Sequence, residues 1–399
     1  MISLGRIFGV DVRAHYSSLF VFGALAGMLA YGYLPQLAPA TPALERIAVA
    51  AILAAVLFGS LLAHELGHAV IARRRGQAVA NVTMYLFGGT THAEDLHATA
   101  GDEIAVGLGG PAVSAAIAVL FLSAGLLLLR VNERAGILLA DVGVANALLA
   151  AFNILPGYPM DGGRVLRGIF WKFGGNAVSA TKRAALGGRL IAYLTMAAGA
   201  AAIAFGDALD GIWILGAGWF LSSLAHAYYR SLMTRMALDG LTAKDFCAAL
   251  PTLQTDDTVA SAATHFGAGA VSRVLAVLFG ERPAGLVSDV DVAQADAGEA
   301  ATTPVSVVMR RLADVAQVDL NVPALDTYSA VTAGPSSAAV VCDEAGCFFG
   351  LVRREDIVRY IDMVEELGNS AAASRQNLRG LVKTAGHLQP DHGSRTNDF

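Results

Sequence analysis

The residues best suited to chemistry are two histidines and a glutamate in the segment LLAHELGHAVIARRR. His64 and His68 are spaced i and i+4, which puts both imidazoles on one face of a helix, and Glu65 follows His64 directly. Such nitrogens suit zinc, and a catalytic zinc site takes three protein ligands and leaves a fourth position for water. Because zinc lowers the pKa of that water towards about 7, Glu65 can take its proton and pass it to a leaving amine. The segment predicts hydrolysis of a peptide bond.

The alternative is an accidental match on an ordinary helix, and the position of the motif weighs against it. The three residues precede the cluster Arg73, Arg74 and Arg75 within a long apolar stretch. At 1.5 Å per residue they lie up to roughly 14 Å inside the membrane edge that the arginines mark. Ionisable groups at that depth are expensive and usually functional, so a working site is favoured.

A third ligand has to come from another segment, and Asp161 in AFNILPGYPMDGGRVLRG is the candidate. This carboxylate lies between a proline-broken helix end and a pair of glycines. Irregular backbone at membrane depth is tolerated only where it lines protein or a water-filled cavity. The alternative role for Asp161 is a helix N-cap before Arg164.

These residues must be positioned by membrane helices, because 55% of the 399 residues are hydrophobic and only 15% are charged. Stretches of roughly 20 apolar residues are long enough to cross a hydrocarbon core of about 30 Å. Six such stretches are expected, at residues 17–34, 47–71, 104–129, 136–155, 190–205 and 212–229.

Charge placement predicts the orientation of these spans. With the N-terminus in the cytoplasm, only Arg46, Arg130 and Arg134 fall in outside loops, and the positive-inside rule favours this arrangement. It also puts the region after about residue 236 in the cytoplasm of the cell, consistent with three sparse cysteines and no disulfide framework. A net charge of -5 without a basic patch predicts no nucleic-acid partner.

The pairing of HELGH in one span with NILPGYPMDGG in a later one resembles the site-2 protease family of intramembrane metalloproteases. The resemblance covers residues 1–237. It implies one zinc ion held by His64, His68 and Asp161, with Glu65 as general base, and substrates that are transmembrane segments of membrane-anchored proteins. It also assigns Asn153 to substrate backbone or a developing oxyanion, a role that suits a preorganised amide donor.

Two further segments fit that family, MYLFGGTTH after the active helix and IAVGLGGPAVS around Gly110 and Pro111. Helix packing by small residues is the alternative for the second. Residues 79–87 are rich in β-formers and flanked by glycine, so a strand or hairpin is expected there. Its edge could pair with an unwound substrate, a hypothesis that proline at Val82 or Met84 would test. Histidines 92 and 97 are expected to be hydrated loop residues, and Asp141 a polar packing contact or a mechanistic group.

The region from residue 238 to 365 repeats a pattern, AGLVSDVDVAQ and FGLVRREDIVRY, which aligns Gly285 with Gly350 and Asp291 with Asp356. The repeats, at about 241–297 and 303–362, look like a tandem pair of cystathionine-β-synthase (CBS) domains. That resemblance implies an adenine nucleotide held by Ser288 and Asp291. Arg353 stands where the second repeat should have a hydroxyl, so a structural role or homodimerisation is the alternative. Residues 366–399 are polar and are expected to be a flexible tail.

The expected fold class is an α-helical polytopic membrane protein of about six transmembrane helices with a short β-hairpin, followed by an α/β cytoplasmic CBS pair. The expected function is an intramembrane zinc endopeptidase regulated by the CBS pair. The rival is a CBS-gated transporter or an inactive metal-binding relative, in which the HELGH spacing and the Asp161 segment would be coincidences.

Overall fold

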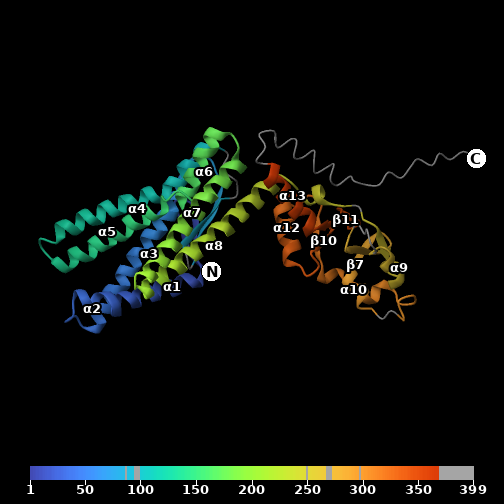
Figure 1. Cartoon of the computed structure of the whole chain (residues 1–399), viewed down its shortest axis with the longest axis horizontal. Helices are drawn as coiled ribbons and strands as arrows, with labels where there is room; N and C mark the ends of the chain where they lie inside the picture. The colour runs from blue at the N-terminus through green and yellow to red at the C-terminus, as the bar shows by residue number, and fades with distance from the viewer. Residues whose placement is uncertain (86–87, 94–98, 249, 267–271, 296–297, 368–399) are drawn as a thin grey trace, which may run out of the picture. The chain divides into compact units, whose positions relative to one another are not determined.

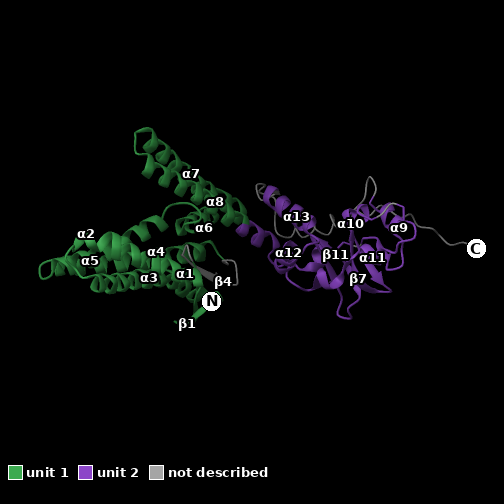
Figure 2. Cartoon of the chain, turned by 90° about the horizontal axis from the view of Figure 1, so that it is seen from below, with its two compact units in different colours: residues 1–230 green, residues 231–399 purple. Residues whose placement is uncertain are grey.

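The computed structural model describes residues 1–85, 88–93, 99–248, 250–266, 272–295 and 298–367. The chain divides into two compact units, residues 1–230 and 231–399, which are coloured separately in Figure 2. The predicted tail therefore lies almost wholly outside the described residues. Each unit is described by itself below.

The first unit contains a four-stranded sheet in the order β1-β2-β3-β4, larger than the hairpin expected from the sequence. Its strands are β1 (Ile2–Ile7), β2 (Val10–Ala14), β3 (Val79–Tyr85) and β4 (Gly88–Ala93). The β3–β4 pair confirms the predicted hairpin, whereas β1 and β2 form a second hairpin that the sequence analysis missed. Phe8 and Gly9 make its tight turn, both with positive φ. β2 pairs with β3 in parallel, so this N-terminal hairpin is tied to the segment that follows the HELGH helix.

Within the described residues, six helices are long and apolar enough to cross a membrane, which agrees with the expected number of spans. They are Tyr16–Leu37 (α1, the π-helical turn η1 and α2), α3 (Ala43–Arg74), α4 (Ala100–Leu128), α5 (Glu133–Asn153), α7 (Ala177–Ala204) and α8 (Ala208–Leu238). In Figure 1, α4 and α5 run side by side along much of their length. Most helices extend beyond the predicted spans at one or both ends, because polar turns outside an apolar core can still be helical.

This unit also contains α6 (Asp161–Gly174), at the place where the sequence allowed a helix start only as the alternative role of Asp161. It is amphipathic and follows the irregular turn between Ile154 and Met160, so hydropathy alone gives no span there. Gly157 and Gly188 let that turn lie directly on α7, since a Cβ on Gly188 would stand 1.9 Å from the Tyr158 carbonyl oxygen. Arg167, which lies between the predicted spans 136–155 and 190–205, is buried on α6 with 3% exposure. The loop therefore packs into the helical unit.

Helices α3 and α4 approach each other through glycines. A Cβ built on Gly67 would lie 2.6 Å from the Gly109 carbonyl oxygen, and one on Gly109 would lie 2.8 Å from the Gly67 carbonyl oxygen. Small residues at a crossing allow backbones this close, which is the usual way membrane helices gain packing energy. The close crossing brings the HELGH turn directly against α4.

The second unit consists of two similar β-α-β-β-α repeats, as the repeated sequence pattern predicted. In the first, β5 is parallel to β6 and β6 is antiparallel to β7; in the second, β9 is parallel to β10 and β10 is antiparallel to β11. The elements are η2 (Ala243–Phe246), β5 (Thr252–Gln254), α9 (Val259–Thr264), β6 (Val274–Phe279), β7 (Arg282–Ser288), α10 (Asp289–Ala293), α11 (Val305–Val308), β8 (Arg310–Arg311), η3 (Leu312–Asp314), β9 (Ala316–Asp319), α12 (Ala324–Ala333), β10 (Ala338–Cys342), β11 (Phe348–Arg353) and α13 (Arg354–Leu367).

Consecutive apolar residues of the central strands build the core of this unit, because both faces of their sheet are buried. Val340, Val341, Leu351 and Val352 are fully buried. The three cysteines are free thiols, and burial raises the pKa of Cys247 to about 12. A thiol with such a pKa stays protonated at neutral pH, so Cys247 acts as a small packing residue.

Candidate metal centre

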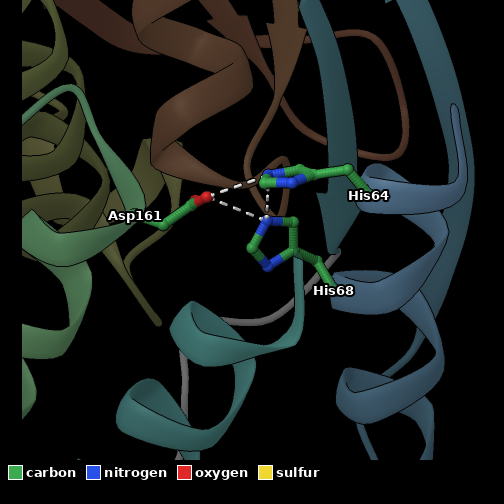
Figure 3. Close-up of side chains that lie close together, drawn as sticks. All are labelled: His64, His68 and Asp161. Carbon is green, nitrogen blue, oxygen red and sulfur yellow. Dashed lines mark hydrogen bonds and ion pairs between the residues drawn. The ribbon is translucent and has the colours of Figure 1, made fainter. Parts of the chain in front are cut away.

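The three predicted metal ligands meet in one place, as Figure 3 shows. His64 and His68 project from consecutive turns of α3 and are buried, with 2% and 3% exposure. Asp161, the first residue of α6, points its carboxylate at both rings. Its Oδ2 lies 3.1 Å from Nε2 of His64 and 3.1 Å from Nε2 of His68, and the two Nε2 atoms are 3.4 Å apart.

These distances fit a shared cation. Zinc bonds of about 2.0–2.1 Å in tetrahedral geometry put neighbouring ligand atoms roughly 3.3 Å apart. The three separations of 3.1, 3.1 and 3.4 Å match the edges of such a tetrahedron. Among the described residues, the two buried imidazoles and the carboxylate form a group that is able to hold a metal ion. The donor set also leaves a fourth position open, as a catalytic site requires.

The far nitrogens of both rings are held by α4. Nδ1 of His68 donates to the Val106 carbonyl oxygen at 2.7 Å, and Nδ1 of His64 lies 2.8 Å from the Ser114 hydroxyl. A carbonyl oxygen only accepts, so the proton of His68 is on Nδ1 and the lone pair of Nε2 faces Asp161. Such outer contacts orient metal-binding histidines. Ser114 belongs to the IAVGLGGPAVS segment, but the sequence analysis gave it no role.

Gly110 supplies the space in front of the histidines. A Cβ at this position would stand 2.3 Å from Nε2 of His68 and 2.5 Å from Nε2 of His64. Any side chain here would occupy the volume into which the two ligand atoms point. The glycine thus has a more specific position than general helix packing, the alternative considered from the sequence.

Asp161 is not the N-cap of α6, because Met160 holds that position and makes no side-chain cap. As the first helical residue, Asp161 has its carboxylate near the positive end of the helix dipole, which favours the ionised form. The carboxylate is engaged with the histidines and does not cap the helix. This geometry favours the ligand role over the capping alternative.

The two other predicted site residues of this unit have different surroundings. Glu65 is half-buried and next to His64, where a general base would be needed. The amide nitrogen of Asn153 donates to the Leu149 carbonyl oxygen at 3.0 Å within α5. An amide nitrogen carries two N–H donors, so this bond leaves one of them for a substrate, and the oxyanion role stays a prediction.

Three further polar residues were named from the sequence: Asp141, His92 and His97. Tyr33 donates a hydrogen bond to Asp141, so Asp141 makes the polar packing contact expected as one of its two roles. The side chain of His92 and the whole of His97 are outside the described part of the chain.

In the second unit, Ser288 and Asp291 form a capping box at the start of α10. The Ser288 hydroxyl donates to Asp291 at 2.6 Å, and Arg310 lies 3.5 Å from the same carboxylate oxygen. In the other repeat, Arg353 takes the place of the serine and pairs with Asp356 at 2.6 Å. The two repeats therefore use different chemistry at equivalent turns.

Fold and site together define a class: multi-pass membrane proteins with an HExxH helix and a distant aspartate, like the zinc metalloproteases of the site-2 type. Relatives agree. Over 63% of its length the chain is 35% identical to Rip3 of Mycobacterium tuberculosis, which is named as a zinc metalloprotease, and covers 64% of it. The chain is 33% identical to the similarly named sll0528 of Synechocystis, over 61% of this chain and 64% of that protein. The predicted resemblance is confirmed.

Structural comparison gives two further similarities. The site-2 protease from Methanocaldococcus jannaschii matches 57% of this chain and 95% of its own, with 25% identity and a TM-score of 0.40. A hemolysin-like CBS-domain protein of Oenococcus oeni matches 33% of this chain and 96% of its own, with 18% identity and a TM-score of 0.29. No family model matches the chain. The chain spans 64% of the length of the curated relatives Rip3 and sll0528.

Replacing Gly110 by alanine tests the geometry of the centre. The new methyl group would overlap both Nε2 atoms, so the imidazoles must swing away and bound zinc should fall to near zero. Gly101→Ala is the matched control on the same helix, because a Cβ there meets only Thr99 Oγ1 at 3.7 Å. Zinc per purified chain is measured for both variants. Full zinc content in Gly110→Ala would show that the ligands are not where the structure has them.

Proposed function

We propose that this protein is an intramembrane zinc endopeptidase that cleaves the transmembrane segments of membrane-anchored proteins. The observation that carries the proposal is the convergence of two imidazoles and a carboxylate, from α3 and α6, at separations that fit one tetrahedral ion. The location of both imidazoles on α3, a helix of membrane length, supports a substrate that is itself in the bilayer.

His64, His68 and Asp161 would hold the zinc ion. When bound, zinc would act as a Lewis acid towards a water molecule and the peptide carbonyl. Glu65, one residue from the first ligand, would accept a proton from the attacking water and donate it to the leaving amine. Val106 and Ser114 would keep the imidazoles oriented throughout. Asn153 would support negative charge on the carbonyl oxygen with the N–H that does not bond Leu149.

An intact transmembrane helix hides its peptide bonds, so a substrate segment has to be extended before cleavage. The edge strands of the sheet are β1 and β4, whereas β3 lies inside it, and β4 is the edge strand within the predicted hairpin. The proline test at Val82 or Met84 is therefore wrong, because both residues are fully buried in a strand with neighbours on either side. Substrate would add to β4 by β-augmentation.

The charge distribution supports a location in the cell membrane, with the N-terminus and the second unit on the cytoplasmic side. The second unit would then bind an adenine nucleotide at Ser288 and Asp291, in the repeat that has the hydroxyl, and would regulate cleavage. Association of two chains through the CBS pair is the second role proposed for this unit.

Replacement of Glu65 by glutamine separates hydrolysis from metal binding. The variant should keep about one zinc per chain but lose roughly 10²- to 10⁴-fold in cleavage rate, because the proton acceptor is gone. Asp161→Ala should lose zinc and activity together. Both are measured on purified protein in liposomes with a transmembrane peptide. Metal flux through the liposomes without cleavage would instead support the transporter alternative.

Proline in β4 tests substrate addition at the sheet edge. One of the neighbouring residues Thr90 and Thr91 must direct its N–H away from β3, so prolines placed singly at both positions should include one that removes a bond to substrate. Cleavage should fall at least tenfold for that variant with zinc unchanged. The alanine variants of the same threonines are the controls. Equal cleavage by both proline variants would contradict the hypothesis.

Adenine nucleotide should act on the full-length protein through Asp291. Adding ATP or AMP is expected to change the cleavage rate at least twofold in the wild type and to have no effect in Asp291→Ala. Zinc content, which depends on the other unit, should be the same in both. Identical rates with and without nucleotide would leave the CBS pair with its structural or dimerising role.

A further inference from the structure

A cluster of charged side chains is buried beside the metal centre. Glu103 of α4 and Arg167 of α6 are 2% and 3% exposed, and Nη1 of Arg167 lies 2.9 Å from Oε2 of Glu103. Arg164 approaches the other carboxylate oxygen, with its Nε 3.9 Å from Oε1. Nε of Arg167 also donates to the Thr181 hydroxyl of α7 at 2.8 Å. One carboxylate thus joins α4 to two successive turns of α6.

Stability alone does not account for this cluster. Removing charges from water is costly, and apolar residues of similar volume usually stabilise a buried site as well as an ion pair does. Charged groups inside a membrane unit are correspondingly rare and tend to serve a function. Glu103 is therefore expected to serve the neighbouring metal centre.

Glu103 begins a stripe along α4 that borders every ligand. Residues 103, 107, 110 and 114 are spaced by four, three and four, so they share one face of the helix. Ser114 contacts His64, and Gly110 faces both imidazoles. A Cβ on Gly107 would lie 3.3 Å from the Asp161 carbonyl oxygen and 3.3 Å from Cβ of Arg164. Gly110 and Ser114 thus face the histidines of α3, whereas Glu103 and Gly107 face α6.

Arg164 lies between two carboxylates. It follows Asp161 by three residues, a spacing that brings side chains together on one helix face, and Glu103 is on its other side. If Glu103 lost its charge, the guanidinium would be attracted to Asp161. A cation paired with the third ligand competes directly with the metal for the same oxygen.

We propose that Glu103 is a positioning residue for the metal centre. It anchors α6 through Arg167, and it holds Arg164 on the α4 side so that the Asp161 carboxylate remains free to bind zinc. This inference rests on the proposed zinc function. It assigns a role to residues that do not themselves contact the ion.

The test compares zinc binding by full-length variants in detergent, using a chelator competition. Glu103→Gln should bind zinc roughly 10- to 100-fold more weakly than wild type, the range typical of lost support around ligands. The absorption spectrum of bound Co²⁺ should change as well. Adding Arg164→Gln to that variant should recover most of the affinity, because the competing cation is removed. Glu133→Gln, at the exposed start of α5, is the matched control.

A purely structural role predicts the opposite for the double variant, which would bind zinc no better than Glu103→Gln. That result, or wild-type affinity in Glu103→Gln, would overturn the proposal. If Glu103→Gln does not fold, the single variant Arg164→Gln tests the proposal, because it keeps the Glu103–Arg167 pair. Its zinc affinity should equal or exceed that of the wild type. A tenfold loss of zinc affinity in Arg164→Gln would reject the proposal. Absence of zinc from the wild type would instead reject the proposed function itself.

Discussion

Two imidazoles and a carboxylate meet between α3 and α6, in surroundings from which water is largely excluded. Such groups are costly in a low dielectric unless they share a cation or a proton. The surrounding structure follows from this requirement. Helix α4 fixes the far nitrogens of the rings, the irregular turn before α6 delivers Asp161, and the Glu103 cluster compensates the two arginines beside it.

Close backbone approach makes the arrangement feasible. Glycines stand where α3 crosses α4, where α4 faces the ligand atoms, and where the turn before α6 lies on α7. Larger residues would separate the helices by more than the reach of a histidine or an aspartate. In a bilayer, where apolar burial between helices gains little, this packing is also a main source of helix association. The same small residues therefore serve both stability and site geometry.

The grouping of His64, His68 and Asp161 was predictable from the sequence for two reasons. The i, i+4 spacing places His64 and His68 on one face, and the topology returns Asp161 to the same side. The six spans followed from hydropathy. By contrast, α6 is amphipathic and shorter than a span, so hydropathy gave no sign that Arg167 is buried in the helical unit. Glu103 and Ser114 depend on the rotation of α4 about its axis, which no local pattern determines. The N-terminal hairpin was missed because β2 pairs with a strand more than 60 residues away.

The parallel pairing of β2 with β3 has a consequence for biogenesis. These strands are hydrogen-bonded, yet two membrane-length helices separate them in the chain. An even number of crossings is the condition for both strands to emerge on one face of the bilayer. A nascent chain in which the first span or α3 failed to insert would leave the strands on opposite faces, and the sheet could not close. The sheet can therefore form only in a chain whose first span and α3 have both crossed the membrane, and the same insertion is needed for His64 and His68 to meet Asp161.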